Sequence, residues 1–212
     1  MTSHRPYAED AANALYDLLF CDEPERFGEL DGPFAPISTA AFDEAAVRAI
    51  AEDDDAESRV RALAYHRLRR EGAAVPRGVL LGVIAEVRLE NGLDTLAAYA
   101  DGRVRYLSQS GAIVIVEEDI AALSAPVAAL FAAAQPLVER IGPWEGERLA
   151  PPGVRRVRLS FLVSDGLHFG EGDMADLARD RLGGPVFNAA AALLAATVDF
   201  ASSGGDAAAA EQ

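Results

Sequence analysis

Between residues 79 and 118 the sequence alternates short apolar runs with tight-turn dipeptides, and this pattern restricts the fold more than any other feature. Leu81, Val83 and Ala85 alternate with other residues up to Asn91-Gly92, a dipeptide typical of tight hairpins. Asp101-Gly102 repeats the turn signal further along. The predicted strands are 81–90, 95–100, 103–107 and 112–116. Consecutive strands with short connections form an antiparallel meander.

Apolar residues at helical spacing predict helices on both sides of this meander. The predicted helices are 7–19, 38–50 and 58–71 before it, and 119–141, 173–181 and 186–200 after it. A second alternating run, 154–163, turns at Asp165-Gly166 into a short strand, 167–169. The sequence therefore predicts an α+β fold, in which an antiparallel meander sheet has flanking helices and an N-terminal helical segment.

The charge is unevenly distributed along the chain. Residues 1–57 hold 3 Arg and 15 Asp or Glu, which gives them a net charge of −12 out of −15 for the whole protein. We expect 1–57 to be an acidic N-terminal helical segment, 58–201 an α+β core domain, and 202–212, with the sequence SSGGDAAAAEQ from position 202, a disordered tail.

Composition narrows the class of protein. Half the residues are hydrophobic and a quarter are charged, as in ordinary globular proteins. The N-terminus lacks a basic region followed by an apolar stretch, which predicts a cytoplasmic protein. The apolar stretches 120–138 and 186–200 are rich in alanine and are interrupted by proline or polar residues, so we expect no membrane partner. A strongly acidic protein binds nucleic acid poorly, so we also expect no nucleic-acid partner.

Four residues that could ligate a metal lie within nine positions: Asp165, His168, Glu171 and Asp173. Imidazole and carboxylate groups at the end of a hairpin could bind a divalent cation or perform acid–base chemistry. Each also has a structural explanation, because Asp165 suits the turn, Asp173 suits a helix N-cap, and His168 alternates along a strand.

Four arginines form a second candidate site, for an anion or for a partner. Arg103 and Arg105 share one face of their strand, as do Arg156 and Arg158. The planar guanidinium group recognises carboxylates and phosphates well. Their partner could be an external anion or the acidic segment 1–57 of the same chain.

The stretches LLFCDEPERF (18–27) and LDTLAAYADGRVRYLSQSG (93–111) resemble segments of uncharacterised bacterial proteins of unknown function. This resemblance implies no activity. The order of elements is also similar to profilin-like and roadblock-like scaffolds, which mostly mediate protein contacts, although the four strands before the central helix are too many for that pattern.

The sequence contains no strong catalytic, zinc or nucleotide-binding signature, so we expect no cofactor. The leading hypothesis is a non-catalytic protein-interaction or binding module, for example an immunity-like protein, whose partner is a basic protein or a second copy of the chain. One alternative is a metal-dependent enzyme or metal-binding protein that uses Asp165, His168, Glu171 and Asp173. Another is a sensor of small anions that uses the arginine-bearing face.

Overall fold

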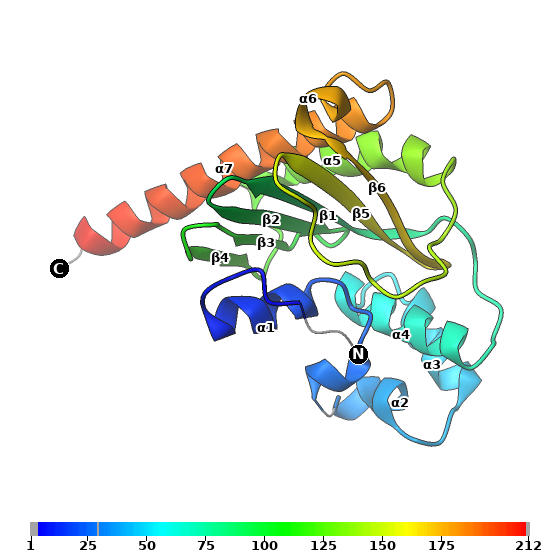
Figure 1. The fold of residues 1–212 in the computed structure, drawn as a ribbon. Coiled ribbons are helices and arrows are strands. Elements are labelled where there is room, and N and C mark those ends of the chain that lie inside the picture. Colours follow the sequence, from blue (N-terminus) through cyan, green and yellow to red (C-terminus); the bar gives the residue numbers. More distant parts are fainter. Residues whose placement is uncertain (1–3, 29, 211–212) are drawn as a thin grey trace.

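A computed structural model describes residues 4–28 and 30–210, and it confirms the α+β fold with a meander sheet. A six-stranded antiparallel sheet lies between two helical layers (Figure 1). Its strands are β1 (Leu80–Leu89), β2 (Gly92–Tyr99), β3 (Val104–Leu107), β4 (Ile113–Val116), β5 (Arg156–Val163) and β6 (Gly166–Asp173). The strand order β4-β3-β2-β1-β5-β6 keeps the first four strands next to their neighbours in sequence.

The second hairpin extends the meander from its first strand. β5 pairs antiparallel with β1, with Ile84 opposite Ser160, and β6 follows on the outer side of β5. Side chains alternate between the two faces of a strand, so each face carries its own apolar cluster. Ile84 and Leu162 face one layer of helices, and Val83 and Phe161 face the other.

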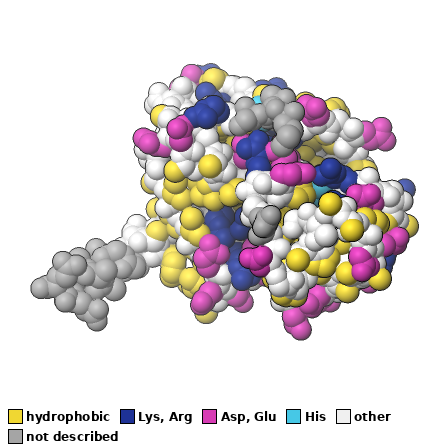
Figure 2. All heavy atoms as spheres, turned by 90° about the horizontal axis from the view of Figure 1, so that it is seen from below, with side chains coloured by type: hydrophobic (Ala, Val, Ile, Leu, Met, Phe, Trp, Pro, Cys, Tyr) yellow, Lys and Arg dark blue, Asp and Glu magenta, His cyan; other side chains and the backbone are white. Residues whose placement is uncertain are grey.

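The N-terminal layer covers one face of the sheet. It contains α1 (Asp10–Leu18), two 3-10 turns, η1 (Pro24–Phe27) and η2 (Gly32–Phe34), and the helices α2 (Ala35–Ser38), α3 (Glu44–Glu52) and α4 (Ser58–Arg70). Tyr16, Val47 and Leu63 from three of these helices are at most 1% exposed and belong to one apolar cluster with Ile84. Residues 1–57 therefore share a core with the sheet. In the view of Figure 2, acidic and basic side chains are interspersed over the outside of this layer.

Two long helices, α5 (Ala121–Val138) and α7 (Gly183–Ala210), cover the other face. Leu130 of α5 and Leu193 of α7 are buried with Phe161 of the sheet. Both helices are long and apolar enough to cross a membrane by length and composition alone. In the structure each helix lays one side on the sheet.

The region after β6 differs from the prediction of a helix over 173–181. β6 continues to Asp173, whose side chain accepts a hydrogen bond from the N–H of Ala175 and begins the short helix α6 (Met174–Leu177). Asp180 accepts hydrogen bonds from the N–H groups of Leu182 and Gly183 at the start of α7. The predicted last helix begins at residue 186, but Gly183-Gly184-Pro185 forms the first turn of α7. Proline is tolerated there because backbone N–H groups in the first turn have no acceptor within the helix, so its missing N–H breaks no hydrogen bond.

Residues 202–210 of the predicted tail fall within α7. The backbone of α7 is helical to Ala210, whereas residues 211–212 lie outside the described part of the chain. The division at residues 57 and 201 into separate units stays a prediction.

Candidate functional site

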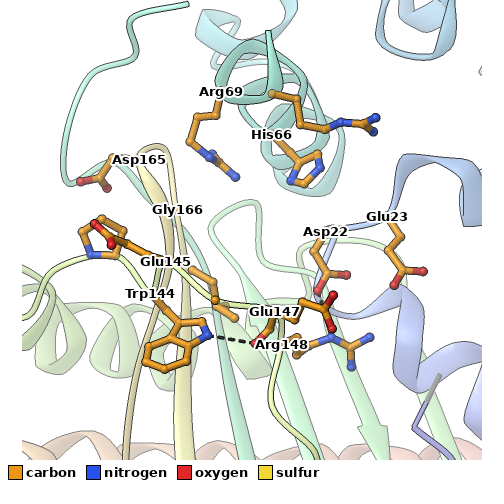
Figure 3. A pocket seen from close by; sticks show the side chains of 14 residues that line it. Asp22, Glu23, His66, Arg69, Trp144, Glu145, Glu147, Arg148, Asp165 and Gly166 are labelled. Atoms are coloured by element: carbon orange, nitrogen blue, oxygen red, sulfur yellow. Dashed lines mark hydrogen bonds and ion pairs between the residues drawn. The ribbon is translucent and has the colours of Figure 1, made fainter. Parts of the chain in front are cut away.

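A cavity of about 570 Å³ opens where four distant parts of the chain meet (Figure 3). Its walls come from the segment after α1, from α4, from the loop between α5 and β5, and from the β5–β6 turn. We call it the charged pocket, and its lining residues are Asp22, Glu23, His66, Arg69, Arg70, Pro143, Trp144, Glu145, Gly146, Glu147, Arg148, Asp165, Gly166 and Leu167.

Helix α4 supplies the basic wall of the charged pocket. Its buried stripe, which includes Leu63 and Leu68, packs on the sheet and leaves His66, Arg69 and Arg70 on the side of the pocket. Arg69 Nη1 donates a hydrogen bond of 2.7 Å to the carbonyl oxygen of Ser164. Burial and the two neighbouring arginines lower the pKa of His66 to about 4, so its imidazole is neutral at pH 7.

An ion-pair network lies beneath the opposite wall. The Arg148 side chain is 8% exposed, and its Nη2 and Nε lie 3.0 Å from Asp17 Oδ1 and 2.9 Å from Asp22 Oδ2. Asp17 also pairs with Arg26 at 2.9 Å. Burial raises the pKa of Asp22 despite the Arg148 guanidinium. Asp22 Oδ1 is buried and has no hydrogen-bond partner among the described residues.

The loop after α5 places an aromatic ring at the mouth of the pocket. The Trp144 backbone N–H donates to the Leu167 carbonyl at 2.7 Å, and its indole Nε1–H donates to the Glu147 carbonyl at 2.9 Å. The indole meets the Phe169 ring edge-on, with the ring centroids 5.3 Å apart. A Cβ at Gly146 would lie 2.8 Å from the indole, so glycine lets the loop fold back over the ring. Trp144 is nevertheless 43% exposed.

The pocket has an excess of negative charge. Its lining includes five carboxylates, Asp22, Glu23, Glu145, Glu147 and Asp165, against three guanidinium groups, Arg69, Arg70 and Arg148. With His66 neutral and all five carboxylates ionised, the lining carries two more negative than positive charges. An exposed aromatic ring next to carboxylates is an environment that stabilises an incoming cation.

The four predicted metal-binding residues do not come together. Asp165 Oδ1 lies 3.2 Å from His168 Nε2, but Glu171 bonds to arginines and Asp173 caps α6. Glu171 is six positions from Asp165, so the extended strand separates the two by about 20 Å. The described residues contain no group of three or more His, Cys, Asp or Glu side chains that could hold a metal ion.

The four predicted anion-binding arginines already have carboxylate neighbours. Arg103 pairs with Asp101 at 3.0 Å, and Arg105, which is 2% exposed, pairs with Glu117 at 2.7 Å. The Glu171 carboxylate forms ion pairs with Arg156 Nε at 2.5 Å and with Arg158 Nη2 at 2.6 Å. Arg105 and Arg158 lie on the sheet face that the N-terminal layer covers. The carboxylates named above nevertheless belong to nearby strands and turns, and none of them belongs to residues 1–57. Their role toward an anion or a partner stays a prediction.

Sequence reasoning missed the charged pocket. Of the predicted site residues, only Asp165 lines it. The lone tryptophan within Gly-Pro-Trp-Glu-Gly-Glu-Arg, residues 142–148, is the local signal that could have indicated a site, because it combines turn residues, acids and an aromatic side chain. Comparison of the chain with known protein families, with curated proteins and with solved structures finds no match.

Proposed function

We propose that this protein is a non-catalytic binding module whose charged pocket receives a cationic side chain from a basic protein partner. The observation that carries the proposal is the exposed indole of Trp144 among an excess of carboxylates. Tryptophan is the best aromatic partner for an ammonium or guanidinium group, and tryptophan is enriched at the energetic centres of protein interfaces.

The charge of the whole chain supports the same class of partner. A net charge of −15 attracts a basic protein at long range and accelerates association. Glu145, on the solvent side of the pocket, can meet an incoming guanidinium group while Trp144 contacts its face. The partner thus supplies an arginine or lysine from an exposed, positively charged surface.

The intrinsic fluorescence of Trp144 tests this proposal, because it is the only tryptophan in the chain. Titration with a hexa-arginine peptide should change the emission saturably at low ionic strength and weakly at high ionic strength. We expect Glu145→Arg to raise the Kd at least about fivefold, because one attraction becomes a repulsion. Glu90→Arg makes the same charge change at a carboxylate 63% exposed on the β1–β2 turn and should have a smaller effect.

Two results would refute the proposal. One is equal weakening by Glu145→Arg and Glu90→Arg, which would mean that only net charge matters. The other is a saturable response to inorganic phosphate with none to hexa-arginine, which would favour an anion sensor. A stoichiometric metal ion that is lost on His168→Ala would instead support the metal-dependent alternative.

A further inference from the structure

The two edges of the sheet are protected to different degrees. At the β6 edge, the loop after α5 contributes one backbone hydrogen bond, from the Trp144 N–H to the Leu167 carbonyl, and the Trp144 ring contacts Phe169. At the opposite edge, β4 pairs with β3 on one side, and the sheet order ends there. Among the described residues, no backbone hydrogen bond joins β4 to an element other than β3. An unpaired strand edge is a template for pairing with another strand.

The register shows which backbone groups of β4 point outward. The Ser108 N–H donates to the Ala112 carbonyl at 2.8 Å, so Ser108 and Ala112 are a hydrogen-bonded pair. Hydrogen-bonded and non-bonded pairs alternate along an antiparallel ladder. Val114 and Val116 therefore bond to β3, and the N–H and C=O groups of Ile113 and Ile115 face away from the sheet.

The side chains of β4 add an apolar surface to this open edge. Ile113 and Ile115 are 39% and 48% exposed, which places them among the large exposed hydrophobic residues of the protein. Soluble proteins usually protect such an edge with lysine, proline or a bulge. The sequence of β4 is Ile-Val-Ile-Val, so the strand contains neither lysine nor proline. Its register with β3 shows no bulge.

Charge around β4 favours a second copy of the chain as the occupant. The strand is followed by Glu117-Glu118-Asp119 and preceded by the uncharged stretch Ser108–Ala112. Antiparallel pairing of two β4 strands about Val114 would place Glu117 of one copy opposite Gly111 of the other. The acidic triplets would then lie at opposite ends of the contact, whereas parallel pairing would bring them together. Each copy carries a net charge of −15, so two copies repel each other. A contact that keeps acidic side chains apart therefore favours self-association.

Helix α7 provides a second, independent indication. Its 28 residues make it about 42 Å long at about 1.5 Å per residue. It contacts β5, β3 and β4, and it continues beyond the β4 edge of the sheet (Figure 1). Val198 of α7 is 42% exposed. A second copy joined at β4 would extend the sheet into the space beside this projecting helix.

We infer that the protein forms a two-fold symmetric homodimer in which two β4 strands pair antiparallel and join two six-stranded sheets into one. Ile113 of each copy exchanges backbone hydrogen bonds with Ile115 of the other. The four isoleucine side chains pack together on the face that carries the N-terminal layer. This contact uses the edge opposite the charged pocket, so it does not depend on the proposed function.

Sedimentation equilibrium of the full-length protein tests the dimer. We expect a mass that rises with concentration from 22.4 kDa toward twice that value. Ile115→Lys should raise the dimer Kd at least about tenfold, because it places a charge inside the contact. Val154→Lys adds the same charge at an aliphatic residue that is 50% exposed in the loop before β5, and it should leave the Kd unchanged.

Hydrogen exchange keeps the test independent of any folding defect in the lysine variant. In the unaltered protein, the amides of Ile113 and Ile115 should become protected as concentration rises through the dimer Kd, while that of Trp144 stays constant. Ile115→Pro removes an outward N–H without removing a bond to β3, and it should also weaken the dimer. A monomer at every concentration would overturn the inference. So would a dimer in which both amides exchange freely, or one that Ile115→Lys leaves intact.

Discussion

Glu86 is the residue whose burial most needs explanation. It lies in β1 beneath α1, and it is 0% exposed. Tyr16 Oη donates a hydrogen bond of 2.6 Å to one carboxylate oxygen, and Arg158 Nη1 lies 4.0 Å from the other. Burial raises the pKa of Glu86 because it disfavours the charged form more than these neighbours favour it.

Replacing Glu86 by glutamine should therefore change how stability depends on pH. The folded protein holds the proton more tightly than the unfolded chain does, so the free energy of unfolding falls as pH rises above the ordinary value of 4.5. A single group contributes at most about 1.4 kcal/mol per pH unit to this fall. Glu86→Gln keeps an acceptor for Tyr16 and removes the fall. In urea unfolding between pH 4.5 and 8, the free energy of unfolding of the variant should increase relative to that of the unaltered protein as pH rises.

Glu171 is a control of opposite sign in the same neighbourhood. Burial raises its pKa, but hydrogen bonds from Arg158 and Arg156 lower it more, and the net direction is downward. Its contribution to stability is present above pH 4.5 and is lost as pH falls through the lowered pKa. Glu171→Gln should thus destabilise the protein at pH 7 and do so less in acid. If both variants changed with pH in the same direction, the assignment of the two carboxylates would be wrong.

At the scale of single elements, the β2–β3 turn depends on one glycine. Gly102 has φ = +85°, a backbone conformation that disfavours residues with a Cβ, and an added Cβ would lie 2.9 Å from Asp119 Cβ. We expect Gly102→Ala to lower the free energy of unfolding by about 2 kcal/mol or more, because strain adds to the steric conflict. Gly72→Ala is the matched variant, since Gly72 has φ = +76° and no atom within 4 Å of an added Cβ.

The comparison of the two glycines separates backbone strain from crowding. Gly72→Ala should cost about 1 kcal/mol, which is the penalty of the left-handed conformation alone. Equal losses in thermal or urea unfolding would show that Asp119 moves aside without cost. A smaller loss for Gly102→Ala than for Gly72→Ala would contradict the turn geometry.

At the scale of the whole molecule, the N-terminal layer should unfold together with the sheet. Leu19 follows α1 and belongs to the same apolar cluster as Leu63 of α4 and Leu107 of β3. Leu19→Ala should lower the free energy of unfolding by about 2–5 kcal/mol, as for other buried leucines. Leu130→Ala, in α5 on the opposite face, should lower it by a similar amount.

Two signals monitor whether there is one transition or two. Far-ultraviolet circular dichroism follows all the helices, and fluorescence follows Trp144. We expect both signals to change at one urea midpoint in the unaltered protein and in each leucine variant. Separate midpoints, with Leu19→Ala moving only one of them, would instead support a separately folding segment 1–57.

The sequence alone determined the local structure of this protein. Alternation, turn dipeptides and helical spacing predicted the meander, the flanking helices and the pairing of Arg156 and Arg158 on one face, because these signals depend on residues close together in the chain. Only the tertiary structure decided that β5 lies beside β1 and that Asp22, His66, Trp144 and Asp165 surround one pocket. A strand pattern specifies which side chains face the core but not which distant strand is the neighbour. That choice follows from burying both faces of the sheet at once, which local sequence does not record.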